Sequence, residues 1–417
     1  MSAGDAAAAG PCRFCRAPLA HTLVDLGMSP LCEAYVAPDQ LDTMEPFYPL
    51  RAHVCDRCWL VQVREYVRPE AIFTEYAYFS SYSDSWLAHA AAYVDRIVPR
   101  LGLGAGSLVV EVGSNDGYLL QYVVARGIPA LGIEPAKNVA AAATARGVTT
   151  ITEMFGRRTA GALVAAGRRA DLLIGNNVLA QVPDLDDFVA GLALVLAPGG
   201  VLTLEFPHLL RLLEENQFDT IYHEHFSYFC LGTAARVLGA HGLAVFDVEE
   251  LPTHGGSLRL CAQAAGPARH PVSARVSALL ERERAAGLEC LETYARFRER
   301  VHEAKRALLE FLIGARRAGK RVAGYGAPGK GNTLLNYCGI GKDFVECTVD
   351  RNPYKQGKYL PGSRIPIFAP EHIHRIRPDY LLILPWNLRD EIMAQMAGIR
   401  AWGGQFVVPI PRVTVHP

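Results

Sequence analysis

One run of the chain gathers several side chains that titrate or hydrogen-bond near neutral pH, Tyr222-His-Glu-His-Phe-Ser-Tyr228. Imidazole and carboxylate groups of this kind suit general acid and base catalysis. A metal site is a second interpretation, but in a strand His223 and His225 share one face and leave Glu224 on the other, an incomplete ligand set. A solvated polar loop is the third. The run follows the last strands of a predicted parallel sheet, near the edge where ligands bind, and this position favours catalysis.

Four of the ten cysteines form two pairs with the spacing of a metal site. Cys12-x-x-Cys15 and Cys55-x-x-Cys58 are separated by 39 residues, which leaves room for a small antiparallel sheet. Four thiolates complete a tetrahedral zinc shell, so the pattern predicts a structural zinc ion without an open position for substrate. The competing interpretation is that two CxxC pairs occur here by chance.

A glycine turn follows the first predicted strand of the central region, in Glu111-Val-Gly-Ser-Asn-Asp-Gly117. Glycines let the backbone approach a ligand, and Glu134, at the end of the next strand, could accept two ribose hydroxyls. The pattern E-x-G-x-x-x-G is not GxGxxG and fits S-adenosylmethionine (SAM) better than NAD. The alternative is an unspecialised glycine turn. The predicted SAM-binding residues are Glu111, Gly113, Ser114, Asn115, Gly117, Glu134, Pro135, Phe155, Asn176 and Asn177.

Three further motifs have polar donors beside glycines. Thr253-His-Gly-Gly-Ser-Leu-Arg259 fits either a ligand-facing loop or a hairpin turn. In Tyr325-Gly-Ala-Pro-Gly-Lys-Gly-Asn332, between a strand and a helix, backbone amides and Lys330 predict an anion site for a diphosphate. The Gly-Lys-[Ser/Thr] ending of a Walker loop is absent, which argues against ATP hydrolysis. The run from Asp350 to Lys358 could bracket a nucleotide or be a charged turn.

Strands and helices must position these motifs. Apolar runs that alternate with helical segments predict a doubly wound parallel sheet, with strands at 108–112, 130–134, 171–175 and 201–205. Helical patterning also covers 85–101, and a long charged helix over 273–317 is expected to connect two parts of the chain. A second α/β unit begins near residue 321, with later strands at 345–349 and 380–384.

The composition limits the classes of protein. Half of the 417 residues are apolar, and Lys+Arg equals Asp+Glu at 42 each, which excludes overall disorder and argues against nucleic-acid binding. The N-terminus has no basic region of a signal peptide, and the apolar run 192–204 is interrupted by Pro198-Gly199-Gly200. We expect a cytoplasmic monomer that binds neither membrane nor nucleic acid.

The motifs together resemble one family, the SAM-dependent nucleotide-sugar 3-C-methyltransferases. This family makes branched deoxysugars of the antibiotic type, such as tetronitrose, from dTDP-4-keto-deoxyhexoses. The resemblance covers nearly the whole chain, because it includes the double CxxC, Glu75-Tyr-Ala-Tyr-Phe-Ser-Ser-Tyr-Ser83 and all the motifs above except the run after Asp350. It implies three parts: a zinc-binding domain at 1–72, a Rossmann-like class I SAM methyltransferase domain at 73–260, and a C-terminal Rossmann-like nucleotide-sugar-binding domain with its connecting helix at 261–417.

The resemblance also implies roles for residues. The base that removes the proton at the third sugar carbon, and so forms an enolate, is expected to be His225, with Tyr222, Glu224 and Tyr76 in the sugar pocket. The nucleotide sugar is expected to lie against Tyr78, Ser83, His254, Ser257, Tyr325, Gly326, Ala327, Lys330, Asn332, Asp350, Arg351 and Lys355.

The chain departs from the family at Gln181, where the family usually carries a histidine. A glutamine amide can bind but cannot titrate, so a proton-shuttle role is lost at this position. Three rival functions remain: a sugar-nucleotide-binding protein that does not methylate, a 4-keto-sugar epimerase, and an O-methyltransferase. The predicted SAM residues Glu134, Asn176 and Asn177 argue against the epimerase, which needs no SAM.

Overall fold

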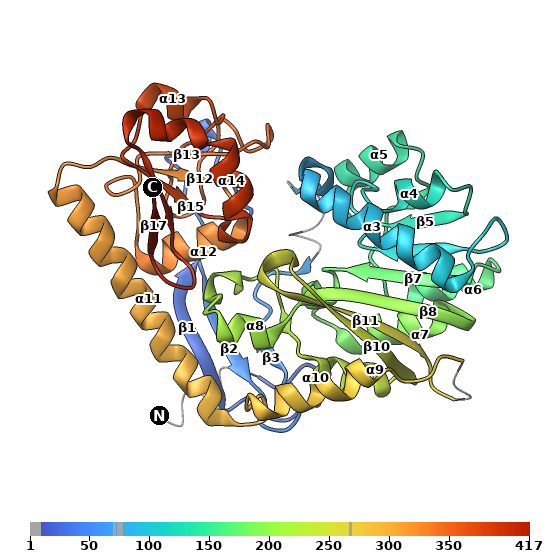
Figure 1. The fold of residues 1–417 in the computed structure, drawn as a ribbon. Helices are drawn as coiled ribbons and strands as arrows, with labels where there is room; N and C mark the ends of the chain where they lie inside the picture. The colour runs from blue at the N-terminus through green and yellow to red at the C-terminus, as the bar shows by residue number, and fades with distance from the viewer. Residues whose placement is uncertain (1–9, 70–71, 73–77, 267–268) are drawn as a thin grey trace.

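Three β-sheets organise the chain, as Figure 1 shows for a computed structural model that describes residues 10–69, 72, 78–266 and 269–417. A four-stranded sheet lies near the N-terminus, a seven-stranded sheet forms the central domain, and a six-stranded sheet forms the C-terminal domain. Tyr76 lies outside the described residues. Among the described residues, no helix is long and apolar enough to cross a bilayer.

The central sheet has the strand order β10-β11-β8-β7-β4-β5-β6. Its members are β4 (Val109–Val112), β5 (Ala130–Ile133), β6 (Thr150–Ile151), β7 (Ala170–Asn176), β8 (Leu196–Pro207), β10 (Leu243–Leu251) and β11 (Ser257–Ala264). The four strands predicted here are confirmed. They pair in parallel with one another, whereas β11 runs antiparallel to both β8 and β10. The chain leaves β4 toward β5 and returns to β7 on its other side, so a crevice opens between the carboxyl ends of β4 and β7.

Helices cover both faces of this sheet: α3 (Asp84–Leu101), α4 (Leu120–Val124), α5 (Lys137–Ala145), α6 (Arg157–Ala165), α7 (Leu185–Val195) and α9 (Leu231–Gly239). Helix α3 agrees with its prediction. It begins where the Ser83 side chain accepts a hydrogen bond from the amide of Trp86 and ends at Gly102, which has the left-handed conformation of a helix C-cap. Short α8 (Leu209–Glu214) follows β8.

The N-terminal sheet consists of β1 (His21–Ser29), β2 (Tyr48–Val54), β3 (Val61–Val63) and β9 (Ser227–Tyr228). Its last strand, β9, comes from the end of the Tyr222–Tyr228 run, and Val61 pairs with Tyr228. A strand nearly 170 residues away in the sequence therefore completes the sheet that carries the cysteines. This pairing was not predicted from the sequence.

The helix predicted over 273–317 is two helices, α10 (Ala274–Ala285) and α11 (Leu291–Arg317). The break falls at Gly287, whose φ of +79° is left-handed, and it allows Leu288 to be fully buried. Figure 1 shows α10 beneath the central domain and α11 rising along β1 to the C-terminal domain.

The C-terminal sheet has the order β14-β13-β12-β15-β16-β17. Its strands are β12 (Val322–Tyr325), β13 (Thr348–Val349), β14 (Ile367–Phe368), β15 (Tyr380–Ile383), β16 (Gln405–Val408) and β17 (Thr414–His416), with α12 (Gly329–Cys338), α13 (His372–Ile376) and α14 (Arg389–Gln395). Strand β13 is shorter than predicted because the amide of Val345 bonds to the Gly341 carbonyl in a turn. The parallel order reverses between β12 and β15, which creates a second crevice.

The hydrophobic cores do not follow the predicted domains. Leu23, Ala52 and other residues of the N-terminal sheet share one core with α11 and the C-terminal domain. Cys12, Cys55 and Leu60 pack in the core of the central domain instead. The predicted boundary after residue 260 falls inside β11. The N-terminal module is thus wedged between the other two domains.

Candidate active site and zinc site

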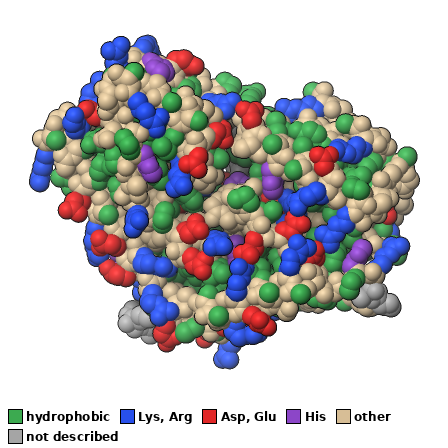
Figure 2. Space-filling view, in the orientation of Figure 1, with side chains coloured by type: hydrophobic (Ala, Val, Ile, Leu, Met, Phe, Trp, Pro, Cys, Tyr) green, Lys and Arg blue, Asp and Glu red, His purple; other side chains and the backbone are tan. Residues whose placement is uncertain are grey.

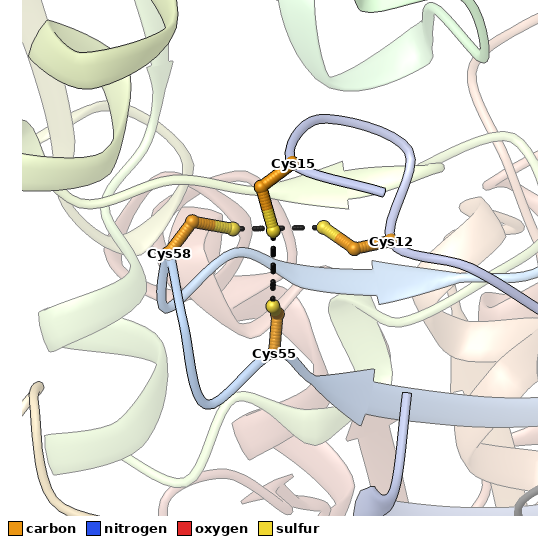
Figure 3. Close-up of side chains that lie close together, drawn as sticks. All are labelled: Cys12, Cys15, Cys55 and Cys58. Carbon is orange, nitrogen blue, oxygen red and sulfur yellow. Dashed lines mark hydrogen bonds between the residues drawn. The ribbon is translucent and has the colours of Figure 1, made fainter. Parts of the chain in front are cut away.

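The four cysteine sulfur atoms predicted as metal ligands converge (Figure 3), all within 4.8 Å of one another. Cys12 Sγ lies 3.5 Å from Cys58 Sγ, and Cys15 Sγ lies 3.4 Å from Cys55 Sγ. Zinc–sulfur bonds of about 2.3 Å place the corners of a tetrahedron about 3.8 Å apart, so the arrangement fits zinc. Because four sulfur atoms fill the shell, zinc bound here is structural.

The zinc knuckles touch the candidate catalytic run. Arg13, inside the first CxxC, donates to the Val63 carbonyl, and its guanidinium carbon lies 5.5 Å from the centre of the Phe226 ring. The amide of Val63 donates in turn to the Phe226 carbonyl at 3.0 Å. Phe226 directly follows His225 in the chain. The zinc module therefore supports the segment that carries the candidate base.

The glycine turn after β4 is built for close approach of a ligand. Gly113 and Gly117 have φ of +69° and +77°, and a Cβ at Gly113 would meet the side chain of Val178 at 3.3 Å. Glu134, buried at the end of β5, accepts hydrogen bonds from the backbone amides of Asn115 at 3.0 Å and Ala136 at 2.9 Å. Burial raises the pKa of the Glu134 carboxyl. Each of its oxygens keeps a second lone pair for a ligand hydroxyl.

Glu111, in β4, supplies a second test of the SAM assignment. Its carboxylate is fully buried, and neither oxygen accepts a hydrogen bond of acceptable geometry from the described residues. Burial raises the pKa of Glu111 well above its ordinary value. The Tyr118 hydroxyl lowers this pKa, but less than burial raises it, so the carboxylate still lacks a cationic partner among the described residues, and the ammonium group of SAM would supply one. Nearby, Asn176 at the end of β7 donates to the Tyr118 hydroxyl at 3.2 Å. These residues fit SAM.

The other predicted SAM residues lie along the same edge. The buried Ser114 hydroxyl has no hydrogen-bond partner among the described residues. Pro135 directly follows Glu134, and the ring of Phe155, after β6, meets the ring of Phe188 edge-on at 5.5 Å. Asn177 has a left-handed φ of +55° and contacts His254.

His225 lies in a turn, where its backbone amide bonds to the carbonyl of Tyr222 at 3.0 Å. Its Nδ1 lies 3.2 Å from the Thr220 carbonyl, and its Nε2 lies 3.1 Å from the Tyr222 hydroxyl. A carbonyl only accepts, so Nδ1 carries the proton and Nε2 is the free base nitrogen. Burial lowers the pKa of His225 to about 3, and neighbouring His254 and Lys330 add to this effect. The imidazole is therefore neutral at pH 7.

His223 points elsewhere. Its Nε2 lies 3.2 Å from the Pro49 carbonyl of β2, and its ring meets those of Tyr48 and Tyr66 edge-on. The extended conformation considered for this run, in which both histidines share a face, is therefore wrong. The turn separates them, and His223 serves the contact with the N-terminal sheet.

Glu224 is buried and accepts a hydrogen bond from the Cys32 thiol at 3.4 Å. Both ring nitrogens of His225 have their partners on Thr220 and Tyr222 instead.

Gln181 stands where the family usually carries a histidine. It ends the short 3-10 helix Leu179–Gln181 after β7 and is half-buried.

Lys330 lies where the C-terminal and central domains meet. Its ammonium donates to Asn387 Oδ1 at 2.7 Å and sits 4.5 Å from the centre of the Trp386 ring. Trp386 in turn donates to Asp219 Oδ2 at 2.7 Å, next to the Thr220 carbonyl that holds His225. Burial lowers the pKa of Lys330 to about 8 and raises that of Asp219 to about 6. A cation is thus held beside the candidate base.

In the second crevice, Asp350 repeats the contact seen at Glu134. Its carboxylate follows β13 and accepts from the amides of Ala327 at 2.7 Å and Asn352 at 2.8 Å. Lys355 is buried, donates to the Ala327 carbonyl at 2.9 Å and lies 3.5 Å from Glu33. Asp350 and Lys355 therefore both hold the glycine loop after β12.

The remaining predicted nucleotide-sugar residues divide into two groups. Those near the crevice hold neighbouring elements: the Tyr325 hydroxyl donates to the Gln395 side chain, and the Asn332 amide donates to the Cys32 carbonyl. Gly326 has a φ of +89°, and a Cβ added at this position would lie only 2.5 Å from Pro385. Ser257 is buried and donates to the Thr253 carbonyl. The others lie near the contact between the central and C-terminal domains. Arg351 forms ion pairs with Asp84 and Glu391. Ser83 caps the N-terminus of α3, and Tyr78 is partly exposed.

A buried charged network at the end of β8 was missed. Glu205 accepts from Arg259 at 2.5 Å and from the Thr253 hydroxyl at 3.0 Å, and His89 Nε2 lies 2.9 Å from it. Burial alone would raise the pKa of Glu205, but hydrogen bonding to His89 and the charge of Arg259 lower it further than burial raises it. Arg259 closes the Thr253–Arg259 motif, so the signal was present, but its partners come from other elements.

Figure 2 shows the surface hollowed between the C-terminal and central domains, with histidine side chains visible in the hollow.

The central sheet order, with one antiparallel strand and a glycine turn at its crevice, defines a class I SAM-dependent methyltransferase. Three family models match: a "Putative zinc binding domain" at 12–73, a "Methyltransferase domain" at 86–248 and a "C-methyltransferase C-terminal domain" at 252–411.

The chain belongs to the C-methyltransferase family, because it is 39% identical over 404 residues to C-methyltransferase NovU of Streptomyces niveus. The alignment covers 97% of this chain and 96% of that protein. The cofactors of the present chain are SAM and a structural zinc ion. Solved structures that align include magnesium protoporphyrin IX methyltransferase of Synechocystis PCC 6803, at 18% identity and TM-score 0.33 over 44% of this chain and 82% of that one. CcbJ methyltransferase of Streptomyces caelestis aligns at 12% identity and TM-score 0.31 over 42% and 88%.

Proposed function

We propose that the chain methylates the third carbon of a dTDP-4-keto-deoxysugar, in the biosynthesis of an antibiotic-type deoxysugar. The observation that carries this proposal is the neutral His225, with its proton on Nδ1 and its lone pair on Nε2. A C–H bond beside a ketone is acidified because the carbanion is delocalised onto the ketone oxygen as an enolate, and a neutral imidazole can accept its proton. An O-methyltransferase has no need of an enolate.

His225 takes the proton from the third carbon onto Nε2, after the Tyr222 hydroxyl turns aside. The electron pair of the C–H bond becomes the new carbon–carbon double bond, and the carbonyl pair moves to oxygen. Thr220 stabilises the imidazolium through Nδ1. SAM, when bound, supplies a methyl group that a carbon nucleophile attacks in line.

The nucleotide is proposed to lie in the second crevice, at the glycine loop after β12. Lys330 and the loop amides favour the diphosphate, and Asp350 stands at the end of the next strand, as Glu134 does in the SAM crevice. In this arrangement the sugar lies between the domains, beside His225 and Lys330.

The domain limits of 1–72, 73–260 and 261–417 remain our proposal for the three domains, although β11 extends four residues beyond the second limit.

Mass spectrometry tests this function. We expect one member of a panel of dTDP-4-keto-deoxysugars to gain a methyl group with SAM, and to exchange hydrogen for deuterium at the third carbon without SAM. Methylation of a hydroxyl without carbon exchange would instead indicate an O-methyltransferase. Exchange with no methyl transfer would favour an epimerase, and binding alone would favour a protein that does not methylate.

A further inference from the structure

Asn177 and His254 form a contact at the carboxyl edge of the central sheet. Both have left-handed backbones although neither is glycine, with φ of +55° and +54°. Asn177 Nδ2 lies 3.2 Å from His254 Nε2. Asparagine and histidine adopt this conformation more readily than most other non-glycine residues. Their contact joins the end of β7 to the loop between β10 and β11.

The hydrogen bond fixes the tautomer of His254. An amide nitrogen only donates, so Nε2 of the neutral ring accepts and Nδ1 carries the proton. None of the described residues forms a hydrogen bond with this Nδ1–H. Within the part of the chain that the structure describes, His254 therefore offers a donor that no other residue uses.

The surrounding loop holds the ring rigidly. The ring of Trp86 meets that of His254 edge-on at 5.1 Å, and Thr253 is anchored to Glu205. Gln217 donates to the Gly255 carbonyl at 2.7 Å, and Trp386 lies so close that a Cβ at Gly255 would be 2.5 Å from its ring. The loop is thus clamped by the central and the C-terminal domains together. A donor held this way is preorganised, which is the condition for strong stabilisation of a developing charge.

The imidazoles of buried His225 and half-buried His254 have complementary proton arrangements. His225 presents a lone pair, whereas His254 presents an N–H, and burial keeps both neutral by lowering their pKa values to about 3 and about 4. Removal of a proton beside a carbonyl needs one group of each kind. Lys330 lies near enough to influence both rings.

We infer that His254, with its tautomer set by Asn177, donates Nδ1–H to the ketone oxygen of the substrate and stabilises the enolate. This inference rests on the proposed function. As the C–H pair moves into the carbon–carbon double bond, the proton passes to His225 and the carbonyl pair to oxygen, where the His254 hydrogen bond shortens. When the carbon is methylated, the pair returns and the ketone is restored.

The test is deuterium exchange at the third carbon, without SAM, in the panel sugar that the wild-type protein exchanges fastest. His254→Ala should slow exchange about 10²–10³-fold, the loss typical of one oxyanion donor. His254→Asn should retain most of the rate, because its amide nitrogen lies near the Nδ1 position and asparagine tolerates a positive φ. Affinities for dTDP and SAM, measured by calorimetry, should be unchanged in both variants.

A second measurement does not depend on turnover. In protein with ¹⁵N-labelled histidine, with the His254→Asn variant to assign the signal, we expect the His254 proton on Nδ1. A proton on Nε2, or exchange by His254→Ala at the wild-type rate, would overturn the inference. Weaker dTDP binding with normal exchange would make His254 a binding residue only. If the wild-type protein exchanges no panel sugar, the proposed function fails instead, and the tautomer measurement still tests the pair.

Discussion

The backbone N–H of Asn115 donates a hydrogen bond to Oε2 of Glu134 at 3.0 Å. The acid that is predicted to hold the ribose of SAM therefore also ties the glycine turn of β4 to the end of β5. We propose that one carboxylate both shapes the crevice and recognises the ligand.

Glu134→Ala should weaken SAM binding by roughly 1.5–3 kcal/mol, the range for a hydrogen bond to a charged group. Calorimetric titration measures this loss, and thermal melting separates it from the lost contacts to the turn. Glu310→Ala, an exposed acid on α11, is the charge-matched control and should bind SAM normally. Unchanged SAM affinity in Glu134→Ala would remove this residue from the site.

Metal analysis should find one tightly held zinc ion per chain. Cys55→Ser should reduce the yield of folded protein rather than the turnover of each folded molecule, because the zinc shell has no open position. Chelation should also speed amide hydrogen exchange in β9, since β9 pairs with β3 of the zinc module. Cys290→Ser, at an isolated cysteine, is the control. A chain without zinc, or activity that follows an exchangeable metal, contradicts the assignment.

His225→Asn should abolish both methylation and deuterium exchange, because general base catalysis contributes about 10²–10⁴-fold. SAM and dTDP binding should survive. His223→Asn is the matched control and should have a milder effect, since His223 bonds to Pro49 and not to the groups around His225. Near wild-type exchange in His225→Asn would place the base elsewhere, with His223, Tyr222 and Tyr76 as the next candidates.

The stability of the protein should record the burial of His225. Its pKa is lowered to about 3 in the folded chain from an ordinary 6.5, so the unfolded chain binds more protons between these values. The stabilisation that depends on the neutral ring is complete above pH 6.5 and is lost as the pH falls toward 3. Denaturant unfolding at several pH values should therefore show wild type losing stability relative to His225→Asn below pH 6.5. A constant difference between the two proteins would show that this histidine titrates normally.

Affinity for dTDP should fall as the pH rises past about 8, where the buried Lys330 loses its charge. Lys330→Gln should bind dTDP more weakly at pH 7, by about 1.5–3 kcal/mol, and should lose the decline above pH 8. Lys342→Gln, on the loop after α12, is the matched control. Wild-type affinity in Lys330→Gln would place the diphosphate away from this lysine.

The sequence by itself determined the local features of this protein. The CxxC spacing located the zinc ligands, and the apolar runs located the strands of the central sheet and placed Glu134 at the end of one of them. These predictions succeed because the conformation of a zinc knuckle, a buried strand or a turn depends mainly on residues that are neighbours in the sequence.

Only the tertiary structure decided which side chains meet across long separations. It turned His223 toward Pro49 and His225 toward Thr220, joined β9 to the zinc module, and brought Glu205, Arg259 and His89 together. Spacing could not separate the two histidines, because a turn and a strand give the same short sequence different faces. It could not reveal the Asn177–His254 pair either, since that contact depends on how β7 and the loop after β10 are placed by the whole sheet.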